Sequence, residues 1–114
     1  MKGEKMKLNI YEKKEIVKTY ETDTYDLMFG TVEDVAQAVN IDQLKNGSRE
    51  EIGLAVVGLV ASNMDGLKDL LKDIFPGLTD KELRGAKTKE VVNVLYEVIA
   101  YTMAEINKGN NGKN

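Results

Sequence analysis

The chain has 114 residues, 16 Lys and Arg against 19 Asp and Glu, a formal net charge of −3, and neither cysteine nor histidine. This length suits one domain with a core of its own. The missing cysteines exclude disulfides, thiolate metal sites and cysteine nucleophiles. Because Arg49 and Arg84 are the only arginines, the composition argues against a nucleic-acid partner. The longest apolar run, 52–61, is too short to cross a bilayer, so we expect a soluble cytoplasmic protein.

A strand pattern comes first in the chain. Apolar and polar residues alternate from residue 6 to residue 11, with three apolar side chains on one side, namely Met6, Leu8 and Ile10. The segment 16–25 is rich in β-branched and aromatic residues, which favours a second strand. Together the two segments predict a β-hairpin.

Helical periodicity replaces the strand pattern after Gly30. Thr31 is expected to cap the first helix, with Asp34 in the first turn, where the helix dipole favours an acid. Apolar residues then follow at helical spacing: Val32, Val35, Ala36 and Val39. Ser48 and Glu51 make a capping-box pattern that predicts the start of a second helix.

The second predicted helix is apolar on nearly every side. Its large apolar residues are Ile52, Leu54, Val56, Val57, Leu59 and Val60. A helix that is apolar all round is normally buried, so we expect this one at the centre of the fold. Gly53 and Gly58 lower its helix propensity by about 1 kcal/mol each, and we expect them to permit close packing against neighbouring helices.

Three further helices are predicted. The segment 63–75 is amphipathic and is ended by Pro76–Gly77. Thr79 and Glu82 form a second capping-box pattern before a short helix. The longest helix is expected over 88–107.

The sequence thus predicts an α+β fold, with a short N-terminal β-hairpin followed by a bundle of four to five α-helices. The hairpin occupies residues 6–25 and the helices residues 31–107, within a single domain over 6–107. Residues 1–5 are charged and patternless, and we expect a flexible leader there. The polar segment 108–114 is expected to be a disordered tail.

No combination of residues indicates catalysis, a cofactor or a metal. Ser48 is explained as a helix cap and Ser62 lies in an apolar helix, and no histidine exists to activate either. Three carboxylates recur at i+4, where they diverge instead of converging on one ion: Asp65, Asp69 and Asp73. The segment from Asp42 lacks the oxygen ligands of a calcium loop, and glycine-rich phosphate motifs are absent. We therefore expect a protein that is not an enzyme.

The last predicted helix has a wider apolar face than burial of one side requires. One row comprises Val92, Leu95, Ile99, Met103 and Ile106. The adjacent row comprises Val91, Val94, Val98 and Tyr101. Two interpretations stay open. Either the helix is buried between two layers of its own domain, or the second row is a face for a partner or for self-association.

Two long segments carry a family resemblance. Residues 6–35, MKLNIYEKKEIVKTYETDTYDLMFGTVEDV, resemble the N-terminal half of tail assembly chaperones from siphophages and prophages of Gram-positive bacteria. Residues 70–99, LLKDIFPGLTDKELRGAKTKEVVNVLYEVI, resemble the C-terminal half, most specifically in the piece FPGLTDKEL at 75–83. The leader 1–5 departs from the family pattern, which leaves Met1 and Met6 as alternative starts.

The resemblance implies a scaffold without catalytic residues. Such proteins oligomerise, coat the tape measure protein before the tail tube forms, and are shed as the major tail protein polymerises. The implied partners are therefore the tape measure protein, further copies of the chain and, secondarily, the major tail protein. The implied location is the host cytoplasm and not the mature virion. The family also implies a longer frameshifted form, for which the tail 108–114 is a suitable junction. A structural virion component, such as a tail-completion or connector protein, is the alternative.

Overall fold

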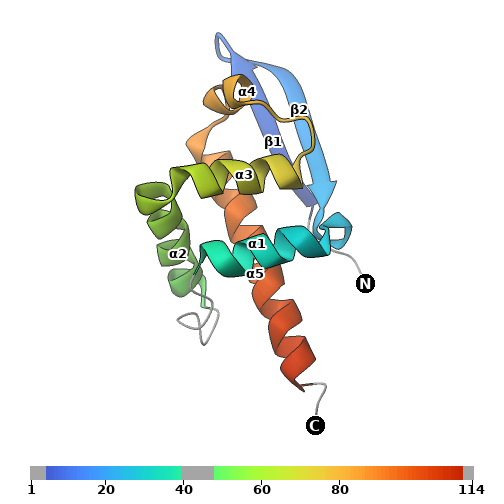
Figure 1. The fold of residues 1–114 in the computed structure, drawn as a ribbon. Coiled ribbons are helices and arrows are strands. Elements are labelled where there is room, and N and C mark those ends of the chain that lie inside the picture. Colours follow the sequence, from blue (N-terminus) through green and yellow to red (C-terminus); the bar gives the residue numbers. More distant parts are fainter. Residues whose placement is uncertain (1–4, 40–47, 112–114) are drawn as a thin grey trace.

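The computed structural model describes residues 5–39 and 48–111, which adopt the predicted α+β fold (Figure 1). The strands and helices are β1 (Lys5–Glu12), β2 (Glu15–Asp23), the 3-10 helix η1 (Thr24–Asp26), α1 (Phe29–Ala38), α2 (Arg49–Ser62), α3 (Met64–Ile74), α4 (Asp80–Arg84) and α5 (Thr88–Asn111). A hairpin followed by helices is what the sequence predicts, and this prediction is confirmed.

The hairpin pairs β1 antiparallel to β2. Lys13 and Lys14 connect the strands with φ of 51° and 71°, the left-handed backbone that a two-residue hairpin turn requires. The predicted inward side of β1 is confirmed, because Met6, Leu8 and Ile10 are all buried. The pairing register shifts after Ile10, near the tip of the hairpin.

The start of α1 differs from the prediction. The helix begins at Phe29 and its N-cap is Met28, which makes no side-chain capping hydrogen bond. Thr31 is not the cap: its amide already donates to the Met28 carbonyl at 3.0 Å, and its side chain is buried. The preference for Ser or Thr at the N-cap does not predict this helix start, because packing against the core places Thr31 inside the helix.

Both predicted capping boxes are confirmed. At the start of α2, the Glu51 amide donates to Ser48 Oγ at 3.2 Å and the Ser48 amide donates back to Glu51 Oε1 at 3.4 Å. At the start of α4, the Glu82 amide donates to Thr79 Oγ1 at 3.1 Å, and the Thr79 amide donates to Glu82 Oε1 at 3.1 Å. Each box satisfies two amides that a helix start leaves unpaired.

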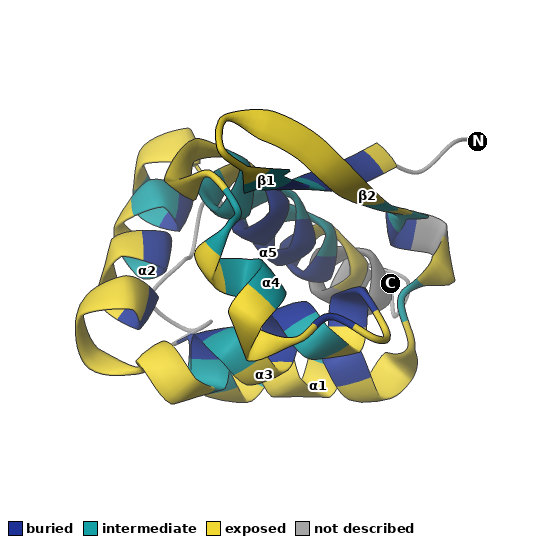
Figure 2. Cartoon of the chain, turned by 90° about the horizontal axis from the view of Figure 1, so that it is seen from above, coloured by how far each residue is buried: buried dark blue, intermediate teal, exposed yellow. Residues whose placement is uncertain are grey.

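The centre of the fold is α5. It lies between the hairpin on one side and α1 and α3 on the other, with α2 along its flank (Figure 2). Apolar side chains from both of its rows are buried: Val94, Leu95, Val98, Ile99 and Met103. Thr102 is buried too, and its hydroxyl donates to the Val98 carbonyl at 2.9 Å. The width of the apolar face therefore follows from packing on both sides.

The expectation that α2 is central is wrong. One side of it packs on the core through Ile52, Val56 and Leu59, while the opposite side is exposed (Figure 2). The central place is taken by α5, whose length lets it contact β1, α1 and α2 together. A helix beside such a core has only one neighbouring surface against which to bury its apolar residues.

Two predicted boundaries of strands and helices differ from the structure. Lys5 belongs to β1, and α5 continues to Asn111 instead of ending near Asn107. The rest of the expected leader and tail, and most of the segment from Asp42, lie outside the described residues.

Candidate protein-binding surface

The exposed side of α2 is the most distinctive surface of the molecule. We call it the α2 outer face and define it by five exposed residues: Leu54, Val57, Gly58, Val60 and Ala61. Leu54 is 72% exposed, Val57 61% and Val60 42%. Leu54, Val57, Gly58 and Ala61 are spaced at i, i+3, i+4 and i+7, so they form one continuous row on the helix. Met64, 44% exposed, begins α3 just beyond this row.

The α2 outer face carries no charge. From Ile52 to Met64 the sequence contains no Asp, Glu, Lys or Arg. A solvent-facing helix side normally holds charged or polar residues, which keep it hydrated. Covering one large aliphatic side chain is worth roughly 1.5–3 kcal/mol, so the bare face forgoes several kcal/mol that a partner would recover. A contiguous apolar patch of this kind marks interaction sites in proteins.

The glycines of α2 do not have the predicted role. A Cβ placed on Gly53 or on Gly58 would meet nothing within 4 Å, so neither residue permits a close contact inside the molecule. Gly58 instead leaves the middle of the α2 outer face flat. A flat position on a helix lets a second helix approach closely.

The predicted partner face on α5 is not a surface. Val94 is 2% exposed and Val98 is 1% exposed, while Val91 and Tyr101 are only partly buried. Two of these four residues are enclosed by the chain itself, so the set cannot form one contact face without unfolding. Of the two interpretations left open for this helix, the structure supports burial within the domain.

A second exposed apolar pair lies away from α2. Met28 and Phe29, at the start of α1, are 73% and 76% exposed. They follow η1, at the opposite end of α1 from α2 (Figure 1). Ile16 and Val17, near the hairpin turn, are each 54% exposed. These pairs are smaller than the α2 outer face and do not extend along a helix.

The hydroxyl and carboxylate residues have structural roles. Ser48 caps α2, and the Ser62 hydroxyl donates to the Gly58 carbonyl at 2.6 Å. Among the described residues, no group of three carboxylates is placed to hold a metal ion. Asp65, Asp69 and Asp73 all lie on α3. Desolvation and a hydrogen bond with Asp34 of α1 raise the pKa of the Asp73 carboxyl.

Glu90 joins α5 to the hairpin. Its carboxylate accepts from the Asn9 amide and from the Tyr11 hydroxyl, each at 2.8 Å. Partial burial raises the pKa of Glu90, but these hydrogen bonds outweigh burial and lower it below its ordinary value. The same contact raises the pKa of Tyr11, because its hydroxyl is held as a donor.

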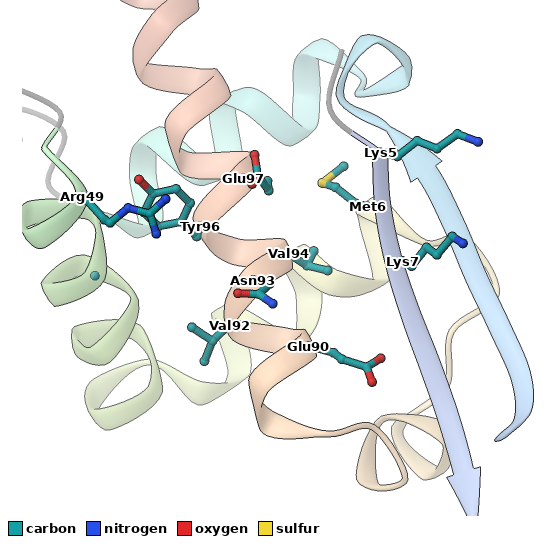
Figure 3. Close-up of a pocket in the computed structure, with 11 residues that line it drawn as sticks. Lys5, Met6, Lys7, Arg49, Glu90, Val92, Asn93, Val94, Tyr96 and Glu97 are labelled. Atoms are coloured by element: carbon teal, nitrogen blue, oxygen red, sulfur yellow. The ribbon is translucent and has the colours of Figure 1, made fainter. Parts of the chain in front are cut away.

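A groove of about 710 Å³ lies between β1 and the first turns of α2, with α5 as its floor (Figure 3). Lys5 and Lys7 line it from β1, and Arg49 and Gly53 line it from α2. The Arg49 guanidinium lies 5.1 Å from the centre of the Tyr96 ring on α5. The sequence analysis missed this groove, since only the fold brings its walls together.

The exposure of α2 had a detectable signal in the sequence. A helix that is apolar all round can be central or can carry an uncovered face, and periodicity does not separate the two. Length favoured the second possibility: α5 has 24 residues and α2 has 14, so α5 is the better candidate for the centre.

Comparisons with protein-family models, curated proteins and solved structures found no match to the chain. Within the described residues, no helix has both the length and the apolar character that a membrane crossing requires.

Proposed function

We propose that this chain is a non-enzymatic binding protein, specifically a tail assembly chaperone that oligomerises and binds the phage tape measure protein before the tail tube polymerises. The observation that carries the proposal is the bare α2 outer face, where Leu54 and Val57 are mostly exposed and no charge interrupts the row. The resemblance of residues 6–35 and 70–99 to these chaperones supplies the identity of the partner.

The α2 outer face suits a helical partner. Helix recognition uses apolar anchors at i, i+3, i+4 and i+7, which is the spacing from Leu54 to Ala61. A tape measure protein is expected to present long apolar helices before assembly. Shielding them would keep that protein soluble until the major tail protein displaces the chaperone.

The proposal includes a location and a lifetime. The chaperone acts in the host cytoplasm, associates with further copies of itself, and is absent from the mature virion. It binds neither nucleic acid nor membrane. Its apolar faces are then covered in turn by copies and by the tape measure protein.

Co-expression with the tape measure protein of the same phage tests the function. The tape measure protein should be recovered soluble and in complex with the chain, and should aggregate when expressed alone. Mass spectrometry of purified virions is the second part of the test. Detection of the chain in virions in stoichiometric amount would favour the alternative, a tail-completion or connector protein.

A further inference from the structure

The outer edge of β1 is protected along only part of its length. The Asn9 amide donates to Glu90 Oε1 at 2.8 Å, and the Tyr11 amide donates to the Gly85 carbonyl at 2.7 Å. Ile10 and Ala86 form an isolated antiparallel bridge at the same place. The outer edge of β1 faces away from β2, and its half at residues 9–11 is therefore paired with other parts of the same chain.

The first half of the same edge has no backbone partner among the described residues. Backbone groups alternate in direction along a strand, so Lys5 and Lys7 direct theirs to the same side as Asn9 and Tyr11. Within residues 5–39 and 48–111, no hydrogen bond to the backbone of Lys7 is found on that side. An unpaired edge of this kind is a template for another strand.

The open edge borders the groove over α5. Lys5, Met6 and Lys7 form its β1 wall, and Arg49 stands on the opposite wall (Figure 3). Met6 points toward α5, whereas the side chains of Lys5 and Lys7 point away from it (Figure 3). An added strand would lie over Asn93 and Tyr96 on the groove floor.

The charged side chains beside the open edge indicate which kind of strand would bind there. Lys5 and Lys7 approach Glu21 at 3.5 and 3.8 Å, but both lysine side chains are more than half exposed, so these pairs are weak. Arg49 lies over the Tyr96 ring across the groove, but Glu90 and Glu97 line the groove as well, so the cations that favour an acidic strand are those of Lys5 and Lys7 beside the edge. The Asn9 amide beside the open edge already donates to a carboxylate, that of Glu90. A second copy would bring its own Lys5 and Lys7 against this edge, which like-charge repulsion opposes.

We propose that the open edge of β1 at Lys5–Lys7 binds an extended acidic peptide segment of a partner protein, which adds as a third strand over α5. The strand would pair with the outward amide of Lys7 and place its carboxylates near Lys5 and Lys7, on the side that faces away from α5. This mode of recognition takes its affinity from backbone hydrogen bonds and its selectivity from side-chain charge. It uses a different surface from the α2 outer face and does not depend on the chaperone assignment.

Titration with a short blocked peptide of alternating glutamate and valine tests the proposal, with amide exchange of the full-length chain followed by NMR. The Lys7 amide should exchange quickly in the free protein and become protected when the peptide binds. The matched control peptide has the same sequence with alternate amides N-methylated on the pairing side, which keeps the charge and removes the hydrogen bonds. It should bind at least about tenfold more weakly.

Variants separate backbone pairing from charge. Lys7→Pro removes the outward amide at a strand edge, where proline is tolerated, and should weaken peptide binding about tenfold relative to Lys7→Gln. Equal binding of the N-methylated peptide, or binding without protection of the Lys7 amide, would overturn the proposal even if Lys7→Pro failed to fold. Protection that rises with protein concentration in the absence of peptide would identify a second copy instead.

Discussion

At the scale of single residues, Glu82 connects more parts of the molecule than its place in a five-residue helix suggests. Besides closing the capping box with Thr79, it accepts from the Tyr20 hydroxyl at 2.6 Å and from Lys18 Nζ at 3.1 Å. The hydrogen bonds from Tyr20 and then Lys18 lower the pKa of Glu82 to about 2. One carboxylate thus holds α4 against β2.

This contact predicts a defined loss of stability in acid. The pKa of Glu82 is lower in the folded chain than its ordinary value of 4.5, so its contribution to stability is complete above about pH 5 and is lost as the pH falls to about 2. Glu82→Gln should make the midpoint of denaturant unfolding less sensitive to pH across this window. Glu33→Gln, an exposed position on α1, is the control and should keep the wild-type slope. An unchanged slope in Glu82→Gln would show that the carboxylate contributes nothing.

Val98 tests whether α5 is an interior helix. It is 1% exposed, so Val98→Asp buries an unpaired carboxylate and should destabilise the chain by more than about 4 kcal/mol. Val57→Asp, the same change at a valine that is 61% exposed, should alter the melting temperature little. A folded Val98→Asp variant with a wild-type melting temperature would contradict the burial of Val98.

At the scale of elements, sequence reasoning placed the strands and helices well because local chemistry determines where they begin. Ser48 and Thr79 cap helices through contacts three residues away, and both boxes are present. Reasoning failed where the answer depends on distant neighbours. Thr31 has a side chain that could cap a helix but lies inside α1, because packing against the core and not a local cap determines where this helix starts.

The candidate site was misplaced for the same reason. The apolar rows of α5 and α2 are alike in composition, and apart from the greater length of α5 only the packing of β1 and α1 decides which helix is covered. Val94 was therefore assigned to a partner face although it is buried, and Leu54 to the core although it is exposed. The open edge of β1 could not be predicted from the sequence, because the pairing of backbone groups does not show in the pattern of side chains.

Two glycines on different elements should respond oppositely to alanine. Gly58 has open space around its missing side chain, so Gly58→Ala should stabilise α2 by about 0.5–1 kcal/mol. A Cβ on Gly85 would lie 2.7 Å from the Tyr11 carbonyl oxygen, so Gly85→Ala should destabilise by about 1–3 kcal/mol. Denaturant unfolding measures both, and loss of stability in Gly58→Ala would mean that the middle of α2 is covered.

At the scale of the whole molecule, the hairpin and the shorter helices surround a long helix, α5, that they enclose. The hairpin covers one side of α5 and is fastened there by Glu90, while α1, α2 and α3 complete the shell. The apolar residues of α2 that this shell does not bury face outward (Figure 2). The molecule therefore has an uncharged apolar face that its own chain does not cover.

Binding of the tape measure protein by the α2 outer face is tested most directly by the affinity of Val57→Lys for that protein. Val17→Lys is the matched control, because Val17 on β2 is 54% exposed and Val57 is 61% exposed. A lysine in the middle of an apolar contact should weaken binding at least about tenfold, with the melting temperature unchanged and Val17→Lys binding like the wild type. Equal affinity of Val57→Lys and the wild type, with both folded, would contradict the claim.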